Sequence, residues 1–330
     1  MINGRNNEVE FERYKELKKQ CINNDVPIKN IELRKKIRPV LRSVLKVQRK
    51  FNNQTVEFIN KTDLISDRPI VFAVTHIGKW DFEIINEQIN KHFYVIASDF
   101  LNMNGNINGI FMNANGVIFV DEKSKEDRKN SELMMKKVLE QGDNMMIFPE
   151  GTWNLSENEI VRDTHLGVAS IALEKDALIL PIAIEQYGKR FVINMGKFIE
   201  PKLVSELYSS IPYAKLDDDD KVEALLKLKI KLKLNEQVRD SMATLKYEIW
   251  DAEGLTRRID IPYDYWQSFI SDRRKEWPGY SMEEQVINVC VPPKKKEYNE
   301  MLEQISKMKI NKNNSFLFMP KNEFVKKYTK

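Results

Sequence analysis

The chain passes from a buried strand into a helix through the stretch Val71-Phe-Ala-Val-Thr-His-Ile-Gly-Lys-Trp-Asp81. The apolar run over residues 70–74 predicts a buried strand, and Asp81 opens an amphipathic segment that predicts a helix. His76 therefore follows a strand end, which is where α/β folds place their chemistry. If Asp81 lies in the first helical turn, its carboxylate fixes the tautomer of His76 and leaves the other ring nitrogen as a general base. The alternative is a structural histidine at a helix start.

Composition narrows the class of protein. The 330 residues are enough for one large domain with appendages or for two modest ones. The 53 lysines and arginines against 49 acidic residues leave a net charge of +4, which argues against a globally basic nucleic-acid binder. Two distant cysteines and three scattered histidines indicate neither a disulfide framework nor a multi-histidine metal centre. No apolar run reaches the ~20 residues that span a bilayer, and the polar N-terminus is no signal peptide. We therefore expect a cytoplasmic protein, soluble or peripheral to a membrane.

Strand and helix patterns alternate through the middle of the chain. The strand candidates are residues 70–74, 93–97, 117–120, 145–148, 177–184 and 191–195, and the helix candidates are 81–89, 131–141 and 166–175. This alternation predicts an α/β fold with a largely parallel central sheet flanked by helices. The Asn/Gly-rich connection 101–115 is either a loop flanking a pocket or a helix-loop crossover.

We expect three regions: an N-terminal segment at 1–59, a catalytic domain at 60–205 and a helical C-terminal extension at 206–330. The polar sequence of residues 1–26 predicts a flexible start or a short helix. Residues 31–51 predict a basic amphipathic helix that begins or kinks near a proline. Such a helix either lies on an anionic membrane surface or packs on the core with a solvated basic face.

The C-terminal extension has its own pattern. An acidic run at 217–220 precedes a Lys/Leu-rich helical pattern at 222–250, where it complements the helix dipole. Aromatic residues between 263 and 280 are expected to pack the extension onto the core.

Other strand ends bring carboxylates toward His76. Asp121 follows one predicted strand, and Glu150 follows the next. Because the carboxyl ends of parallel strands meet at one edge of a sheet, we expect His76, Asp81, Asp121 and Glu150 to converge.

Four motifs in this order resemble the glycerolipid and lysophospholipid acyltransferase family, which includes the bacterial 1-acylglycerol-3-phosphate acyltransferases. They are His-x4-Asp at 76–81, Gly-x-x-Phe-x-Asp at 116–121, Phe-Pro-Glu-Gly-Thr at 148–152 and an apolar-Pro-apolar strand at 180–184. His-x4-Asp alone occurs often by chance, whereas Phe-Pro-Glu-Gly-Thr is distinctive. The resemblance covers residues 60–200 and implies a glycerol-phosphate acyltransferase-like fold.

The resemblance implies transfer of a fatty acyl group from acyl-CoA or acyl carrier protein to a hydroxyl of a lysophospholipid or glycerolipid-type acceptor, with no cofactor and no metal. His76 acts as general base and Asp81 orients it, without a covalent acyl-enzyme. Backbone N–H groups near residues 78–81 are candidates for stabilising the oxyanion. The residues expected to bind substrate are Lys79, Asp121, Glu150, Gly151, Thr152 and Pro181, the last of which shapes the acyl side of the site or is purely structural.

Two departures from the family's motifs leave the identity of the acyl acceptor open. Much of the family has an arginine, suited to an acceptor phosphate, where this chain has Glu122 and Trp153. Lys79, Lys123 and Arg162 are the candidates to replace that charge. A glycolipid or another hydroxylated lipid therefore remains an alternative acceptor. A lipid-binding protein without turnover and a thioester or ester hydrolase remain alternative functions.

The two other histidines are expected outside the dyad. His92 is expected at the surface, at a strand entry. His165 is expected to be an ordinary residue near the start of a helix, although the loop after Thr152 can bring it to the site.

Overall fold

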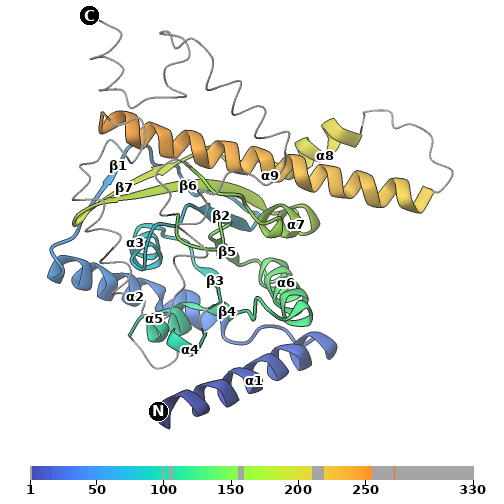
Figure 1. The fold of residues 1–330 in the computed structure, drawn as a ribbon, viewed down its shortest axis with the longest axis horizontal. Helices are drawn as coiled ribbons and strands as arrows, with labels where there is room; N and C mark the ends of the chain where they lie inside the picture. Colours follow the sequence, from blue (N-terminus) through green and yellow to red (C-terminus); the bar gives the residue numbers. More distant parts are fainter. Residues whose placement is uncertain are drawn as a thin grey trace, which may run out of the picture.

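A mostly parallel seven-stranded sheet forms the centre of the computed structural model (Figure 1). The structure describes residues 2–98, 100–103, 107–154, 160–209, 219–254 and 271. The sheet order is β1-β7-β6-β2-β5-β3-β4, and the pair β6–β7 is antiparallel while all other neighbours are parallel. The strands are β1 (Thr55–Phe58), β2 (Ile70–Val74), β3 (Phe93–Ala97), β4 (Val117–Phe119), β5 (Asn144–Ile147), β6 (Leu178–Tyr187) and β7 (Arg190–Met195). The predicted α/β class is confirmed.

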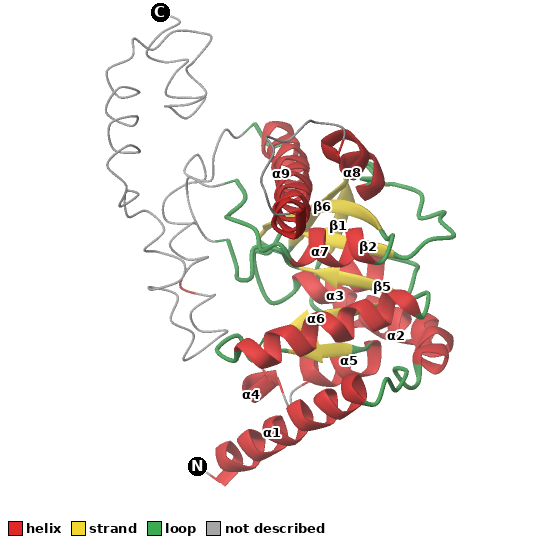
Figure 2. Cartoon of the chain, turned by 90° about the vertical axis from the view of Figure 1, so that its right-hand side faces the viewer, coloured by secondary structure: helices red, strands yellow, loops and turns green. Residues whose placement is uncertain are grey.

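Helices cover both faces of the sheet. They are α1 (Ile2–Asn23), α2 (Ile31–Phe51), α3 (Asp81–Gln88), α4 (Phe100–Met103), α5 (Ile107–Asn115), α6 (Lys125–Glu140), α7 (Gly167–Glu174), α8 (Pro201–Ser209) and α9 (Asp219–Ala252). One apolar cluster joins the sheet to α3 and α5, and a second joins its other face to α6, α7 and α9. Figure 1 places α9 beyond β6 at one end of the molecule and α1 beyond β4 at the other, and α9 and α1 lie at opposite ends in Figure 2 as well.

The strands that carry the expected site are buried on both faces. Every residue of β2 and of β5 is buried, so β2 and the part of β5 after Asn144 appear in the sequence as continuous apolar runs instead of alternating ones. This burial explains why both were predictable. The short edge strand β1 was not predicted, and it lies within the segment that we expected to precede the catalytic domain.

Three helix predictions need correction. Residues 2–23 form a long helix instead of a flexible start or a short helix. Helix α2 spans the predicted residues 31–51, but Pro39 lies inside it with its ring in solvent, so the expectation that this proline marks a helix start is wrong. Water can replace the lost hydrogen bond on that exposed side. Helix α6 begins six residues before the predicted start, because the Ser124 side chain caps it by accepting from Asp127 N.

Helix α1 is held by a buried cation. Lys18 Nζ donates to Phe119 O at 2.7 Å and to Ser131 Oγ at 2.8 Å, and it pairs with Asp127. Tyr14 adds an edge-on ring contact with Phe119. Because these partners lie about a hundred residues away in sequence, only the fold explains why this polar segment is an ordered helix.

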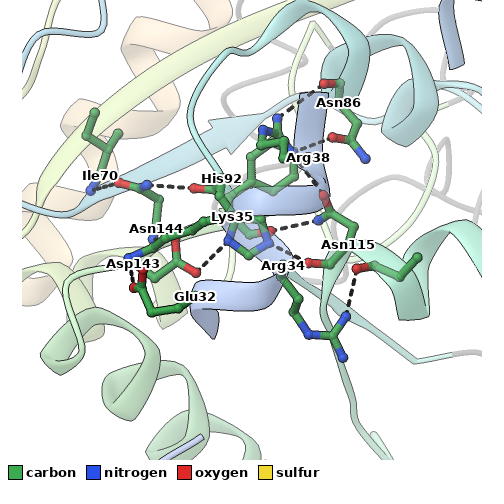
Figure 3. Close-up of polar contacts among 12 residues, drawn as sticks. Glu32, Arg34, Lys35, Arg38, Ile70, Asn86, His92, Asn115, Asp143 and Asn144 are labelled. Carbon is green, nitrogen blue, oxygen red and sulfur yellow. Dashed lines mark hydrogen bonds and ion pairs between the residues drawn. The ribbon is translucent and has the colours of Figure 1, made fainter. Parts of the chain in front are cut away.

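His92 is buried, so the prediction of a surface residue is wrong. Its Nδ1 lies 2.6 Å from Asp143 Oδ2 and its Nε2 lies 2.7 Å from Asn115 O (Figure 3). Arg38 of α2 joins the same network by donating to the side chains of Asn86 and Asn115. This network lies where β3 and β5 begin, at the opposite end of these strands from the expected site, and it fixes α2 to the sheet.

The C-terminal part is described only through residue 254 and at residue 271. The predicted helix at 222–250 is confirmed within α9, whose Leu234, Val238 and Met242 are fully buried against the sheet face. The predicted packing of the aromatic residues 263–280 lies outside the described residues.

Candidate active site

His76 and Asp81 meet at the carboxyl end of β2. His76 Nδ1 lies 2.8 Å from Asp81 Oδ2. Because an ionised carboxylate only accepts, this contact places a proton on Nδ1 and leaves the Nε2 lone pair free. The Asp81 side chain is fully buried, and that of His76 is 20% exposed. No residue in the described part of the chain hydrogen-bonds to Nε2, so this nitrogen is available to a substrate hydroxyl.

Asp81 also folds the loop that carries the histidine. The same oxygen, Oδ2, accepts from Ile77 N at 2.6 Å and from Gly78 N at 2.9 Å. These bonds explain how a five-residue spacing, which does not suit one helix face, still brings the two side chains together. They also occupy the first two backbone N–H groups after His76. The expectation that N–H groups near residues 78–81 bind an oxyanion is therefore wrong for Gly78.

Two aromatic residues hold the imidazole ring. Phe148 stacks on His76 with ring centroids 4.0 Å apart and planes inclined by 17°. Trp153 meets the same ring edge-on at 6.1 Å and is itself buried. Phe148 belongs to a motif that the sequence singled out, but its contact with the histidine was not predicted. The Trp153 indole fills space beside the dyad and carries no charge.

Glu150 binds the backbone beside His76. Its Oε1 accepts from His76 N at 3.0 Å and its Oε2 accepts from Arg162 N at 2.9 Å, and the side chain is buried. The convergence of Glu150 with His76 and Asp81 is therefore confirmed, but both carboxylate oxygens are engaged by the protein itself. Glu150 shapes the wall of the site in this structure, and its expected contact with the acceptor stays a prediction.

Asp121 lies apart from the dyad, so its predicted convergence is wrong. Strand β4 is three strands from β2, which corresponds to about 14 Å at the usual spacing. Asp121 Oδ2 instead accepts from Lys15 Nζ of α1 at 3.1 Å. Burial raises the pKa of Asp121, but the hydrogen bonds from Lys15 and from Lys123 N outweigh this effect and lower it. The order of strands, which the motif spacing does not reveal, causes the separation.

The remaining predicted residues surround the dyad at different depths. Gly151 has φ +70°, and a Cβ there would come within 2.7 Å of His165 Nε2, so only glycine suits this turn. Thr152 follows it and is half-buried. His165 is exposed and its N donates to Pro149 O, which places this histidine against the motif turn.

Pro181 and Lys79 flank the strand that leads to His76. Pro181 is buried in β6 opposite Ala73 of β2, and its carbonyl accepts from Gly196 N, as in ordinary sheet packing. Lys79 Nζ lies 5.1 Å from the Trp80 ring centroid. Neither placement tests a role in substrate binding.

A second buried carboxyl lies near the first turn of α3. Burial raises the pKa of Glu83 to about 8, because the charged form is poorly solvated there. The raised pKa of Glu83 disfavours a second negative charge beside Asp81. Among the described residues, no group of three or more His, Cys, Asp or Glu side chains is arranged to hold a metal ion.

The crystal structure of the 1-acyl-sn-glycerophosphate (LPA) acyltransferase PlsC from Thermotoga maritima matches with a TM-score of 0.43 and 13% identity, over 68% of this chain and 96% of that one. No curated protein sequence gives a significant match. The family model described as Acyltransferase matches residues 55–185, which contain the dyad and the Phe-Pro-Glu-Gly-Thr turn. Residues 55–185 of the chain thus form an acyltransferase domain.

Proposed function

We propose that this protein is an O-acyltransferase that moves a fatty acyl group from the thioester of acyl-CoA or acyl carrier protein to a hydroxyl of a lysophospholipid or glycerolipid-type acceptor. The observation that carries the proposal is the 2.8 Å contact between His76 Nδ1 and the buried Asp81 carboxylate. That contact leaves Nε2 as the accepting nitrogen within an acyltransferase-family domain.

The dyad supports direct attack by the acceptor. Nε2 of His76 takes the hydroxyl proton as the oxygen bonds to the thioester carbonyl carbon. The tetrahedral intermediate then expels the thiolate, which takes the proton back from the imidazolium. The Asp81 carboxylate, in contact with Nδ1, stabilises the imidazolium that forms. General base catalysis of this kind typically contributes ~10²–10⁴-fold, and positioning of the two substrates contributes further.

An acyl-transfer assay tests the proposal. Purified protein is incubated with acyl-CoA or acylated carrier protein and a panel of lysolipid, monoacylglycerol and glycolipid acceptors, and products are identified by mass spectrometry. We expect acylated product only when an acceptor is present. Free fatty acid without an acceptor would instead identify a hydrolase. Lipid binding with no turnover of any donor would favour a non-catalytic lipid-binding protein.

We also propose that α2 lies on an anionic membrane surface. Its exposed face carries an apolar stripe at helical spacing, whose side chains are 39–84% exposed: Leu33, Ile37, Val40, Val44, Val47 and Phe51. Lys36, Lys46 and Lys50 are exposed on the same helix. Apolar side chains bordered by lysines match the chemistry of an anionic lipid surface. No helix among the described residues is both long and apolar enough to cross a membrane.

Vesicle binding tests the role of the stripe. Replacing Val40 and Val47 with aspartate places two charges on the exposed stripe, and we expect at least a tenfold loss of sedimentation with vesicles that contain anionic lipid. Both residues are exposed, so the melting temperature should change little. The matched control replaces Val9 and Leu17, which are exposed on α1, with aspartate. An equal loss in both double variants would show that α2 is not the contact surface.

A further inference from the structure

The loop between β5 and α7 has two limbs that lie beside His76. The first limb, residues 148–154, leaves β5, and the second limb, residues 160–166, enters α7. Glu150 of the first limb joins both to the histidine, because its Oε1 accepts from His76 N at 3.0 Å and its Oε2 accepts from Arg162 N at 2.9 Å. The backbone of His76 is thus connected to the second limb through one buried carboxylate.

Asn154 makes a second connection of the same kind. This residue is fully buried, and its backbone N donates to His76 O at 2.6 Å. Its side-chain Nδ2 donates to Ile160 O of the second limb at 3.1 Å. Because the N–H and the carbonyl group of His76 are both held in this way, the position of the histidine depends on where the second limb lies.

Helix α9 holds the second limb from the outside. Asn235 Nδ2 donates to Thr164 Oγ1 at 2.9 Å and to Thr164 O at 3.2 Å. Val161 of the second limb is buried in the same apolar cluster as Leu234 and Val238 of α9. The helix therefore contacts this limb through apolar packing and through one amide side chain.

The amide of Asn235 is the specific part of this attachment. Its Oδ1 is buried and has no hydrogen-bond partner in the described part of the chain, which costs stability, so the amide serves the second limb through its donor alone. Arg239 also reaches this limb, but its Nη2 lies 3.5 Å from Val161 O and 3.6 Å from Asp163 Oδ1. Contacts that are this long and exposed contribute little.

We propose that Asn235 is a positioning residue for acyl transfer, which acts on His76 through the second limb and Glu150. This inference rests on the proposed acyltransferase function and assigns part of the catalytic geometry to α9, which lies outside the matched residues 55–185. Nε2 of His76 must reach the acceptor hydroxyl as the new bond forms, and a misplacement of ~1 Å can cost ~10²-fold in rate. Release of the second limb should therefore lower kcat more than it raises KM.

Asn235→Asp tests the donor with almost no change in side-chain size. Because an ionised carboxylate cannot donate to Thr164 O, we expect kcat to fall ~10–100-fold while KM for either substrate changes less than ~3-fold. Asn235→Gln keeps the amide on a longer side chain and should recover part of the loss. The matched control is Gln237→Glu, which makes the same change from amide to carboxylate at an exposed position of α9 and should retain the kcat of wild type.

Amide hydrogen exchange of the full chain measures the loop independently of turnover. Asn235→Asp should speed exchange at Arg162 N, whose bond to Glu150 depends on the position of the second limb, and should leave the amides of β2 protected. Gln237→Glu should change neither. The measurements are made well below the melting temperature of each variant, so that all of them are folded.

Four outcomes would overturn the inference. Unchanged kcat in Asn235→Asp would show that the dyad does not depend on this bond, and equal losses in Gln237→Glu would indicate a general effect of negative charge on α9. A loss of kcat with unchanged exchange at Arg162 N would show that Asn235 does not act through this loop. Faster exchange throughout the sheet, with kcat lowered only near the melting temperature, would indicate a purely structural residue.

The exchange measurement also separates this inference from the proposed function. If wild type transferred no acyl group from any donor to any acceptor, but Asn235→Asp still sped exchange at Arg162 N alone, the acyltransferase function would be rejected. The control of the loop by α9 would then be retained.

Discussion

Replacement of His76 by alanine is expected to lower kcat for acyl transfer by ~10²–10⁴-fold, which is the usual contribution of a positioned general base. The loss should fall on kcat more than on KM for the acceptor, because the proton is taken only as the new bond forms. Steady-state kinetics with product detection by mass spectrometry measure both. The fold should persist, since Asp81 Oδ2 keeps its bonds to Ile77 N and Gly78 N in the variant.

Asp81→Asn is the matched comparison. The amide oxygen can still accept from the two backbone N–H groups, so the loop is kept, but the negative charge that stabilises the imidazolium is lost. We expect a large loss of kcat with little change in melting temperature. A His76→Ala variant that retains activity within tenfold of wild type would show that another group removes the proton.

The local part of the site was predictable because its determinants are close in sequence. His76 and Asp81 are separated by a single strand-to-helix turn, and the buried strand before them gives a continuous apolar run. The strand positions of β2 and β5 follow from the same burial. The spacing alone did not reveal that Asp81 Oδ2 also accepts two backbone N–H groups.

The contacts between distant segments were not predictable from the motifs. Asp121 follows a strand end, as Glu150 does, yet only Glu150 reaches His76, because β5 is the neighbour of β2 whereas β4 lies three strands away. The sheet order depends on the packing of the whole chain. In the same way, the polar side chains of α1 gave no sign that Lys18 would be buried against residues about a hundred positions away.

Lys246→Met is expected to destabilise the fold by ~3–5 kcal/mol, the usual cost of breaking a buried ion pair by removing one partner. Lys246 of α9 is fully buried, and its Nζ lies 2.9 Å from Oε1 of Glu185 in β6, which is also buried. The pair joins the C-terminal helix to the strand that neighbours β2. Equilibrium denaturation of the full chain, read by circular dichroism, measures the change.

The double variant Lys246→Met with Glu185→Leu distinguishes the contribution of the ion pair to stability from the contribution of side-chain packing. Both charges are then absent, and replacement of a buried ion pair by apolar residues of similar volume is often neutral or stabilising. We therefore expect the double variant to regain most of the stability that the single variant loses. If both variants were equally unstable, the stabilisation would come from the aliphatic packing of α9 on β6, and the ion pair would contribute none of it. Recovery in the double variant would show that the loss of one partner of the ion pair destabilises the fold more than the loss of both. The ion pair would then determine how stably α9 is attached to β6, the strand next to the one that leads to His76.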